Sequence, residues 1–62
     1  MEFKVGDEVV LNTARINGNV TIPIGTIGEV VGPRTELGND VYYVIDFHGY
    51  SNKHIVNEKD LT

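Results

Sequence analysis

The chain has 62 residues, which is enough for one small domain, and we expect a single domain spanning residues 1–62. It contains no cysteine, which excludes disulfide bridges and thiolate metal sites. Nine acidic and five basic residues give a formal net charge of −4. This balance argues against a nucleic-acid-binding protein, because such proteins rely on Lys and Arg contacts with phosphates.

The distribution of apolar residues predicts a cytoplasmic protein that makes no contact with a membrane. No apolar run approaches the roughly 18 residues that a membrane-spanning helix needs. The first residues also lack the apolar core of an export signal.

The first predicted strand covers residues 8–11. Val9 and Leu11 share one face of it by the two-residue period, and Val10 points to the other face. Phe3, in the preceding tail, is expected to anchor against the core.

Residues 12–24 are expected to form a long loop that contains a small ribbon. Asn17-Gly18 suits a type I′ hairpin turn, because both residues tolerate positive φ. Arg15-Ile16 and Asn19-Val20 would then pair on either side of the turn. Pro23 bars a central strand immediately after the ribbon.

A second strand is predicted over residues 26–31, and Gly28 within it indicates a bend or a close backbone approach. Gly32-Pro33 ends this strand. Residues 35–40 are predicted to form a polar hairpin loop.

The strongest strand signal lies at residues 41–47, which are rich in β-branched and aromatic side chains. Tyr43, Ile45 and Phe47 fall on one face and are predicted to belong to the core. Tyr42 and Val44 then point outward.

The end of the chain is predicted to form a returning strand and one helical turn. His48-Gly49 turns the chain, and residues 50–56 run back as a strand. Residues 57–61 form the helical turn, with Asn57 as its N-cap and Leu61 packing into the core.

Four segments, taken in order, resemble SH3-like small barrels, and among these the KOW-type and the stand-alone bacterial barrels. The segments are VGDEVVL (residues 5–11), IGTIGEVV (24–31), YVIDFHG (43–49) and VNEKDL (56–61). The resemblance covers nearly the whole chain and implies an all-β, five-stranded, partly open barrel with one short 3-10 or helical turn near the C-terminus. It does not specify a function, because barrels of this kind serve many functions.

This chain departs from the functional patterns of two such groups of barrels. KOW modules that bind RNA tend to be basic, whereas this chain is acidic. Barrels that bind proline-rich peptides use an aromatic-lined groove with acidic loop residues, and the loop over residues 12–24 has neither.

Catalytic and metal-binding interpretations find little support in the sequence. Asp46, His48 and His54 are the only acid–histidine cluster, and we interpret the two histidines as surface residues of an exposed hairpin. Ser51 would need one of these histidines as a base to act as a nucleophile. The glycines at positions 25, 28 and 32 lack the Lys-Ser/Thr and the helix of a phosphate loop. We therefore predict a protein that is not an enzyme and that has no metal or cofactor.

Protein binding is the preferred functional hypothesis. Ile27, Val31, Tyr42 and Val44 would share an outer apolar patch, which the loop over residues 12–24 or the N-terminal tail could instead cover. We also expect an exposed aromatic anchor at Tyr50 and polar contacts from Arg34 and His48. The predicted partner-binding residues are Tyr42, Val44, Tyr50, Ile27, Val31, Arg34 and His48.

The chain would then be a non-catalytic interaction module, of the kind found in small bacterial or phage regulators that dock on a larger protein. Its acidity favours a partner protein with a basic surface. Two alternatives remain open. One is a KOW-like module that binds RNA or DNA through Arg15, Arg34, Lys53 and Lys59. The other is a small structural subunit that is ordered only within an assembly.

Overall fold

The computed structural model describes residues 2–62, and Met1 lies outside the described part. The fold is all-β, with one short 3-10 helix near the C-terminus. The elements, in chain order, are β1 (Glu8–Val10), β2 (Arg15–Asn17), β3 (Val20–Ile22), β4 (Ile27–Val30), β5 (Thr35–Leu37), β6 (Asp40–Phe47), β7 (Lys53–Asn57) and η1 (Glu58–Asp60).

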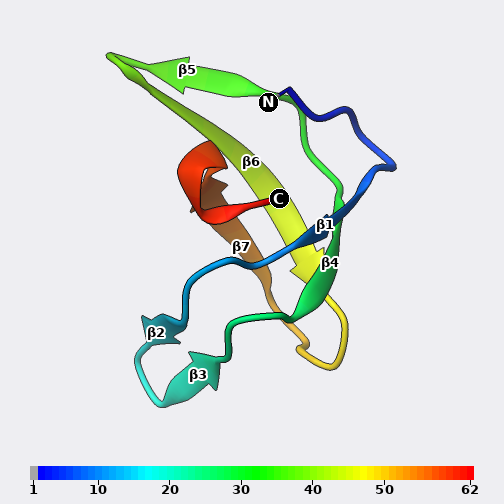
Figure 1. The fold of residues 1–62 in the computed structure, drawn as a ribbon, viewed down its shortest axis with the longest axis vertical. Coiled ribbons are helices and arrows are strands. Elements are labelled where there is room, and N and C mark those ends of the chain that lie inside the picture. Colours follow the sequence, from blue (N-terminus) through cyan, green and yellow to red (C-terminus); the bar gives the residue numbers. More distant parts are fainter. Residues whose placement is uncertain (1) are drawn as a thin grey trace.

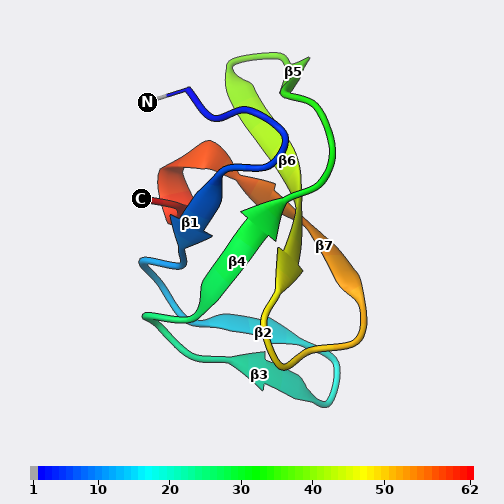
Figure 2. The ribbon, with the colours of Figure 1, turned by 90° about the vertical axis from the view of Figure 1, so that its right-hand side faces the viewer.

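Five of these strands form one curled antiparallel sheet around β6, the longest strand (Figure 1). The order is β1-β4-β6-β5, and β7 pairs with the opposite edge of β6. β4 pairs with the C-terminal half of β6 and β5 with its N-terminal half. The strands β2 and β3 form a separate hairpin beneath the end of the sheet where β6 turns into β7 (Figure 2). The predicted all-β, five-stranded, partly open barrel is confirmed.

The two ends of the chain close the barrel by pairing residues 10–12 with residues 60–62. Leu11 and Leu61 form an isolated antiparallel bridge. Val10 and Thr62 exchange two backbone hydrogen bonds of 2.9 Å each. The last strand of the barrel is therefore reduced to this short bridge.

The predicted helical turn is a 3-10 helix, and Asn57 is its N-cap as expected. The Asn57 side-chain oxygen accepts a hydrogen bond of 3.0 Å from the Lys59 backbone N–H. This bond satisfies one of the N–H groups left free at the start of the helix. Leu61, immediately after the helix, is buried as predicted.

The core lies on the concave face of the sheet and follows the two-residue period. Tyr43, Ile45 and Phe47 on β6 are at most 1% exposed, as their alternation predicts. Val9 and Leu11 share the same interior, and Phe3 packs against it from the N-terminal tail. The full set of buried apolar residues is Phe3, Val9, Leu11, Ile22, Val30, Tyr43, Ile45, Phe47, Val56 and Leu61.

Gly28 lies where β4 crosses the aromatic end of β6. A Cβ atom at this position would lie 2.6 Å from Ile45 Cγ2 and 3.2 Å from the Asp46 carbonyl oxygen. A side chain here would displace both a core residue and the backbone of the central strand. The close backbone approach predicted at Gly28 is therefore present.

The hairpin formed by β2 and β3 turns one residue later than the sequence analysis predicts. Asn17 pairs with Val20, so the two turn residues are Gly18 and Asn19, and not Asn17 and Gly18. Gly18 has a φ of 63°, and no non-glycine residue in the described part has a positive φ. A type I′ turn needs positive φ at both central residues, so the predicted turn type is wrong.

Two other boundaries differ from the prediction. Residues 35–40 are not only a polar loop, because Thr35–Leu37 pairs with β6 across a turn at Gly38 and Asn39. The returning strand begins at Lys53, because the turn that follows β6 extends through Asn52. Turn-forming residues dominate both segments, so composition alone does not show where pairing begins.

The Tyr43 hydroxyl connects three parts of the chain. It accepts a hydrogen bond of 3.0 Å from the Phe3 backbone N–H and donates one of 2.8 Å to Glu58 Oε2. The Phe3 ring packs edge-on against Tyr43, with 5.5 Å between the ring centroids. The N-terminal tail, the central strand and η1 therefore meet at one buried hydroxyl.

We expect Gly28→Ala to destabilise the fold by about 1–3 kcal/mol, because the new methyl group overpacks a filled interior. Glu36→Ala is the control, since it places alanine at an exposed strand position and removes only an exposed ion pair with Arg34. Urea unfolding followed by circular dichroism measures both. A Gly28→Ala variant as stable as the control would show that β4 can move away from β6.

Burial is the main cause that raises the pKa of Tyr43, and its hydrogen bond to Glu58 adds to the effect. A raised folded-state pKa means that this stability is complete below the ordinary tyrosine pKa of about 10 and is lost as the pH rises through the folded value. We expect Tyr43→Phe to lose about 1–3 kcal/mol at neutral pH, because the buried Phe3 N–H loses its acceptor. Urea midpoints from neutral to alkaline pH should fall less steeply for Tyr43→Phe than for the wild type. If the urea midpoints of the two proteins fall equally with pH, the Tyr43 hydroxyl does not have this role.

Candidate functional site

The outer face of the sheet carries a row of charged residues that crosses four neighbouring strands. Glu8 on β1 lies opposite Glu29 on β4, and Glu29 lies opposite Asp46 on β6. Asp46 in turn lies opposite Lys53 on β7. We call Glu8, Glu29 and Asp46 the acidic row. These residues face outward because their neighbours Val9, Val30 and Ile45 face the core.

The acidic row is electrostatically unfavourable in the free protein. Like charges directly opposite one another on neighbouring strands destabilise a sheet. Glu29 takes part in two such pairs, one with Glu8 and one with Asp46. Glu8 and Glu29 are exposed and Asp46 is half-buried, so water screens the repulsion only in part. A cation bound over the acidic row would relieve this repulsion.

Apolar side chains flank the acidic row on both sides. Ile27, opposite Val10, lies toward one end of β4 and is 42% exposed. Ile55, opposite Val44, lies on the other side of the row and is 65% exposed. The outer face therefore combines negative charge with exposed apolar surface.

The predicted outer patch is only partly open. Val31 and Val44 lie side by side, since the Val31 N–H donates to the Val44 carbonyl at 2.9 Å, but both are half-buried. Gly32 packs on Val44 so closely that a Cβ atom at this glycine would lie 2.8 Å from the valine side chain. The chain that follows β4 therefore covers part of the patch.

The structure separates the other predicted partner-binding residues. Tyr42 is half-buried between Thr35 on β5 and Asn57 on β7. His48 is exposed, and its backbone N–H donates to the Ile27 carbonyl, which keeps it near that end of the outer face. Arg34 precedes β5, at the end of the molecule away from the β6–β7 turn (Figure 1).

Arg34 is also held within the chain. Its guanidinium forms an ion pair with the Glu36 carboxylate on β5. This hydrogen bond is the main cause that raises the pKa of Arg34, and desolvation opposes it. The Arg34 side chain is therefore less free to contact a partner than its sequence position predicts.

Tyr50 is not the exposed anchor that the sequence suggests. It is half-buried, packs against the core, and donates from its hydroxyl to the Thr21 carbonyl on β3 at 3.4 Å. The aromatic ring therefore lies between the core and the β2–β3 hairpin. Tyr50 therefore belongs to the mouth of the barrel and not to its outer face.

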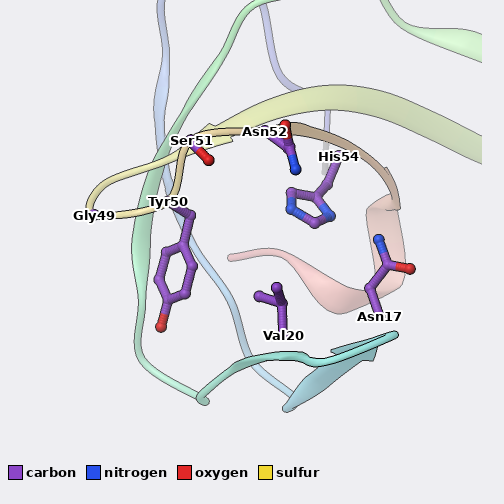
Figure 3. A pocket seen from close by; sticks show the side chains of 7 residues that line it. All are labelled: Asn17, Val20, Gly49, Tyr50, Ser51, Asn52 and His54. Carbon is purple, nitrogen blue, oxygen red and sulfur yellow. The ribbon is translucent and has the colours of Figure 1, made fainter.

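A hollow of about 250 Å³ lies at this mouth, between the β2–β3 hairpin and the turn that joins β6 to β7 (Figure 3). Its lining residues are Asn17, Val20, Gly49, Tyr50, Ser51, Asn52 and His54. We call it the mouth hollow. The hairpin is held at β7 by Arg15, whose Nη2 donates to the Ile55 carbonyl at 2.8 Å.

His54 is buried at this hollow, whereas the sequence analysis places it on the surface. It is 6% exposed, lies opposite Ile45 in the sheet, and contacts the Phe47 ring. The interior side of β7 includes Val56, and the two-residue period carries His54 to the same side.

The predicted acid–histidine cluster does not converge. Asp46 faces outward within the acidic row, and His54 faces inward at the mouth hollow. Within residues 2–62, no three His, Cys, Asp or Glu side chains are grouped so that they could hold a metal ion. Ser51 and His54 both line the hollow, but no hydrogen bond joins them in the part of the chain that the structure describes.

Comparisons with known proteins give no family for this chain. No protein-family model matches it, and neither the curated proteins nor the solved structures contain a significant match. Among residues 2–62, no helix has the length and apolar character needed to cross a bilayer.

We expect Glu29→Gln to stabilise the protein by about 0.2–1 kcal/mol, because it removes both repulsive cross-strand pairs of the acidic row. Glu36→Gln is the matched control, since it makes the same charge change on β5 and weakens an exposed ion pair. Urea unfolding at low ionic strength should show the difference, and added salt should reduce it. Equal stability changes in the two variants would show that the acidic row carries no particular repulsion.

Proposed function

We propose that this chain is a non-catalytic interaction module that docks on a partner protein through the outer face of β1, β4, β6 and β7. The partner presents a basic surface. The observation that carries the proposal is the acidic row, in which Glu8, Glu29 and Asp46 lie opposite one another on adjacent strands.

Binding a cationic surface would both form new ion pairs and remove existing repulsion. In the free protein Lys53 lies opposite only the last member of the acidic row. Lys or Arg side chains of a partner would supply the missing positive charge between Glu8 and Glu29. Complementary charge of this kind accelerates association and selects the correct partner.

The apolar flanks would supply the desolvated part of such an interface. Ile27 and Ile55 remain accessible on either side of the acidic row, and Val31 and Val44 add partly exposed methyl groups on the Ile55 side. Protein–protein interfaces combine buried apolar area with about ten direct hydrogen bonds, and here the apolar area lies on both sides of the charged row instead of at its centre. Tyr42 and His48 lie on elements that border this surface and would contribute at its edge.

The basic residues give less support to the rival hypothesis of nucleic-acid binding. Arg15 is bonded to the Ile55 carbonyl and Arg34 to Glu36. Lys59 Nζ lies 3.7 Å from an Asp40 carboxylate oxygen, and Lys53 lies opposite Asp46. The carboxylates of Glu36 and Asp40 offset the charges of Arg34 and Lys59, and the bond to Ile55 occupies donors of Arg15 that a phosphate would need.

The small size and the resemblance to SH3-like stand-alone barrels suit a regulator that acts by occupying a surface of a larger protein. Such a module needs no cleft for chemistry, because its effect comes from covering a site on its partner. On the ground of that resemblance alone, we also propose that this chain is a bacterial or phage regulator.

The test is affinity capture with the tagged full chain, followed by quantitative mass spectrometry. Glu29→Gln combined with Asp46→Asn should reduce recovery of the partner by roughly tenfold, which corresponds to about 1.4 kcal/mol. The control, Glu36→Gln combined with Asp60→Asn, makes the same change in net charge away from the acidic row and should recover the partner in full. Raising the salt concentration should release the partner from the wild type.

Equal recovery by the two double variants would place the interface elsewhere. Fluorescence anisotropy with labelled RNA and duplex DNA at low salt provides the second arm. Saturable, salt-dependent binding of either nucleic acid would replace protein docking with the rival function.

A further inference from the structure

The mouth hollow is distinct from the outer face in position and in chemistry. It lies on the core side of the sheet, between the β2–β3 hairpin and the turn that joins β6 to β7 (Figure 3). Barrel mouths are frequent locations for small-molecule sites. The hollow does not take part in the proposed docking surface, so its function is a separate question.

His54 is the residue that points to a ligand. Its side chain is more than nine-tenths buried, since only 6% of the residue is exposed, and its ring faces the hollow (Figure 3). No hydrogen bond joins the imidazole to any of residues 2–62. Its ring contact is with Phe47, at 5.8 Å between centroids and tilted by 59°.

One His54 ring nitrogen donates and the other accepts a hydrogen bond, and neither is among the buried side-chain atoms that lack a partner in the described residues. Both nitrogens are therefore open to whatever occupies the hollow. Val56, two positions later on the same side of β7, is fully buried in the apolar core, so His54 is the polar residue on this side of the strand. A ligand that offers both an acceptor and a donor would satisfy the His54 ring.

The other lining residues restrict the ligand to an uncharged one. Asn17 and Asn52 supply amides that both donate and accept, and Ser51 supplies a hydroxyl. No Asp, Glu, Lys or Arg side chain lines the hollow within the described part of the chain. The protein offers no opposite charge to an ion there, and its net charge of −4 opposes the approach of an anion.

Two lining residues provide a flat apolar contact. The Tyr50 ring stands at one side of the hollow, and Val20 rises from the hairpin between Tyr50 and Asn17 (Figure 3). Aromatic side chains bind planar heterocycles by stacking, while amides and imidazoles bond their polar edges. The volume of about 250 Å³ is below the usual range for drug-sized ligands, which limits the occupant to about one ring system.

We propose that the mouth hollow binds an uncharged, planar heterocycle with adjacent hydrogen-bond donors and acceptors, such as the base of a free nucleoside. The face of the base packs against Tyr50 and Val20. Its polar edge bonds the His54 imidazole and the amides of Asn17 and Asn52.

The experiment is a titration of the full chain with adenosine and with cytidine, followed by the amide correlation NMR spectrum. Saturable shifts should appear at the lining residues, Val20, Tyr50 and His54 among them, and not at the acidic row. Absence of saturable shifts with both nucleosides, or shifts centred on the outer face, would overturn the proposal.

Variants identify the groups that bind the base. Asn52→Ala changes an exposed turn residue and should weaken binding by about fivefold, the effect of one lost hydrogen bond. Asn39→Ala, in the exposed turn between β5 and β6, is the matched control and should bind as the wild type does. His54→Phe should abolish binding. Should that buried substitution unfold the chain, the comparison of Asn52→Ala with Asn39→Ala decides, and equal affinities in those two would overturn the assignment.

Two further probes test the stated chemistry. Benzene is flat but has no donors or acceptors, and it should produce no saturable shift at the lining residues. Cytidine monophosphate should bind no more tightly than cytidine, because no cationic side chain lines the hollow. Tighter binding of the monophosphate, or equal binding of benzene, would exclude recognition of a neutral polar edge.

Discussion

The buried hydroxyl of Tyr43 is the contact on which the arrangement of this small barrel depends. It bonds both the N-terminal tail at Phe3 and the 3-10 helix at Glu58, while its ring lies in the middle of the core. A chain of 62 residues without cysteine has little surface to bury and no covalent crosslink. The bonds that join both ends of the chain to the central strand compensate in part for this small core. The Leu11–Leu61 bridge then closes the barrel. This end of the barrel is sealed by specific contacts, whereas the β2–β3 hairpin leaves the mouth hollow at the other.

The acidic row follows from the way the core sets the register of the strands. Gly28 lies opposite both Val9 and Phe47, and only a residue without a side chain fits between Ile45 and the backbone of β6. Once this register is fixed, the residues adjacent to Val9, Gly28 and Phe47 point outward. These adjacent residues, Glu8, Glu29 and Asp46, therefore lie in line across the three strands. The repulsion between them is therefore a consequence of core packing, since moving any strand by one residue would expose the apolar interior. The register itself does not require carboxylates at these positions, because neutral side chains would fit it equally well.

Local patterns in the sequence predict the strands well and their pairing less well. The alternation in residues 41–47 is enough to assign Tyr43, Ile45 and Phe47 to the core, and Asn57 is recognisable as a cap. The two-residue alternation on β7 places His54 on the same inner side as Val56. The polarity of histidine points instead to the surface, which is why the sequence alone predicts an exposed His54. The sequence alone does not distinguish a turn at Gly18-Asn19 from one at Asn17-Gly18, because both pairs contain glycine. The pairing of β2 with β3 determines which pair forms the turn. The acidic row needs the register of four strands at once, and that register depends on contacts between distant residues.

Strand alternation also explains how one sheet can carry two faces of opposite character. Lys53 and His54 are neighbours on β7, yet the first lies opposite Asp46 on the outer face and the second opposite Ile45 on the inner face. On the outer face water screens the charges in part, so a row of carboxylates is tolerated there. On the inner face, where His54 is 6% exposed, burial makes an unpaired charge far more costly than a neutral polar group. The neutral imidazole of His54 is therefore a polar group that the inner face can hold, while the amides and the hydroxyl around it lie on exposed residues.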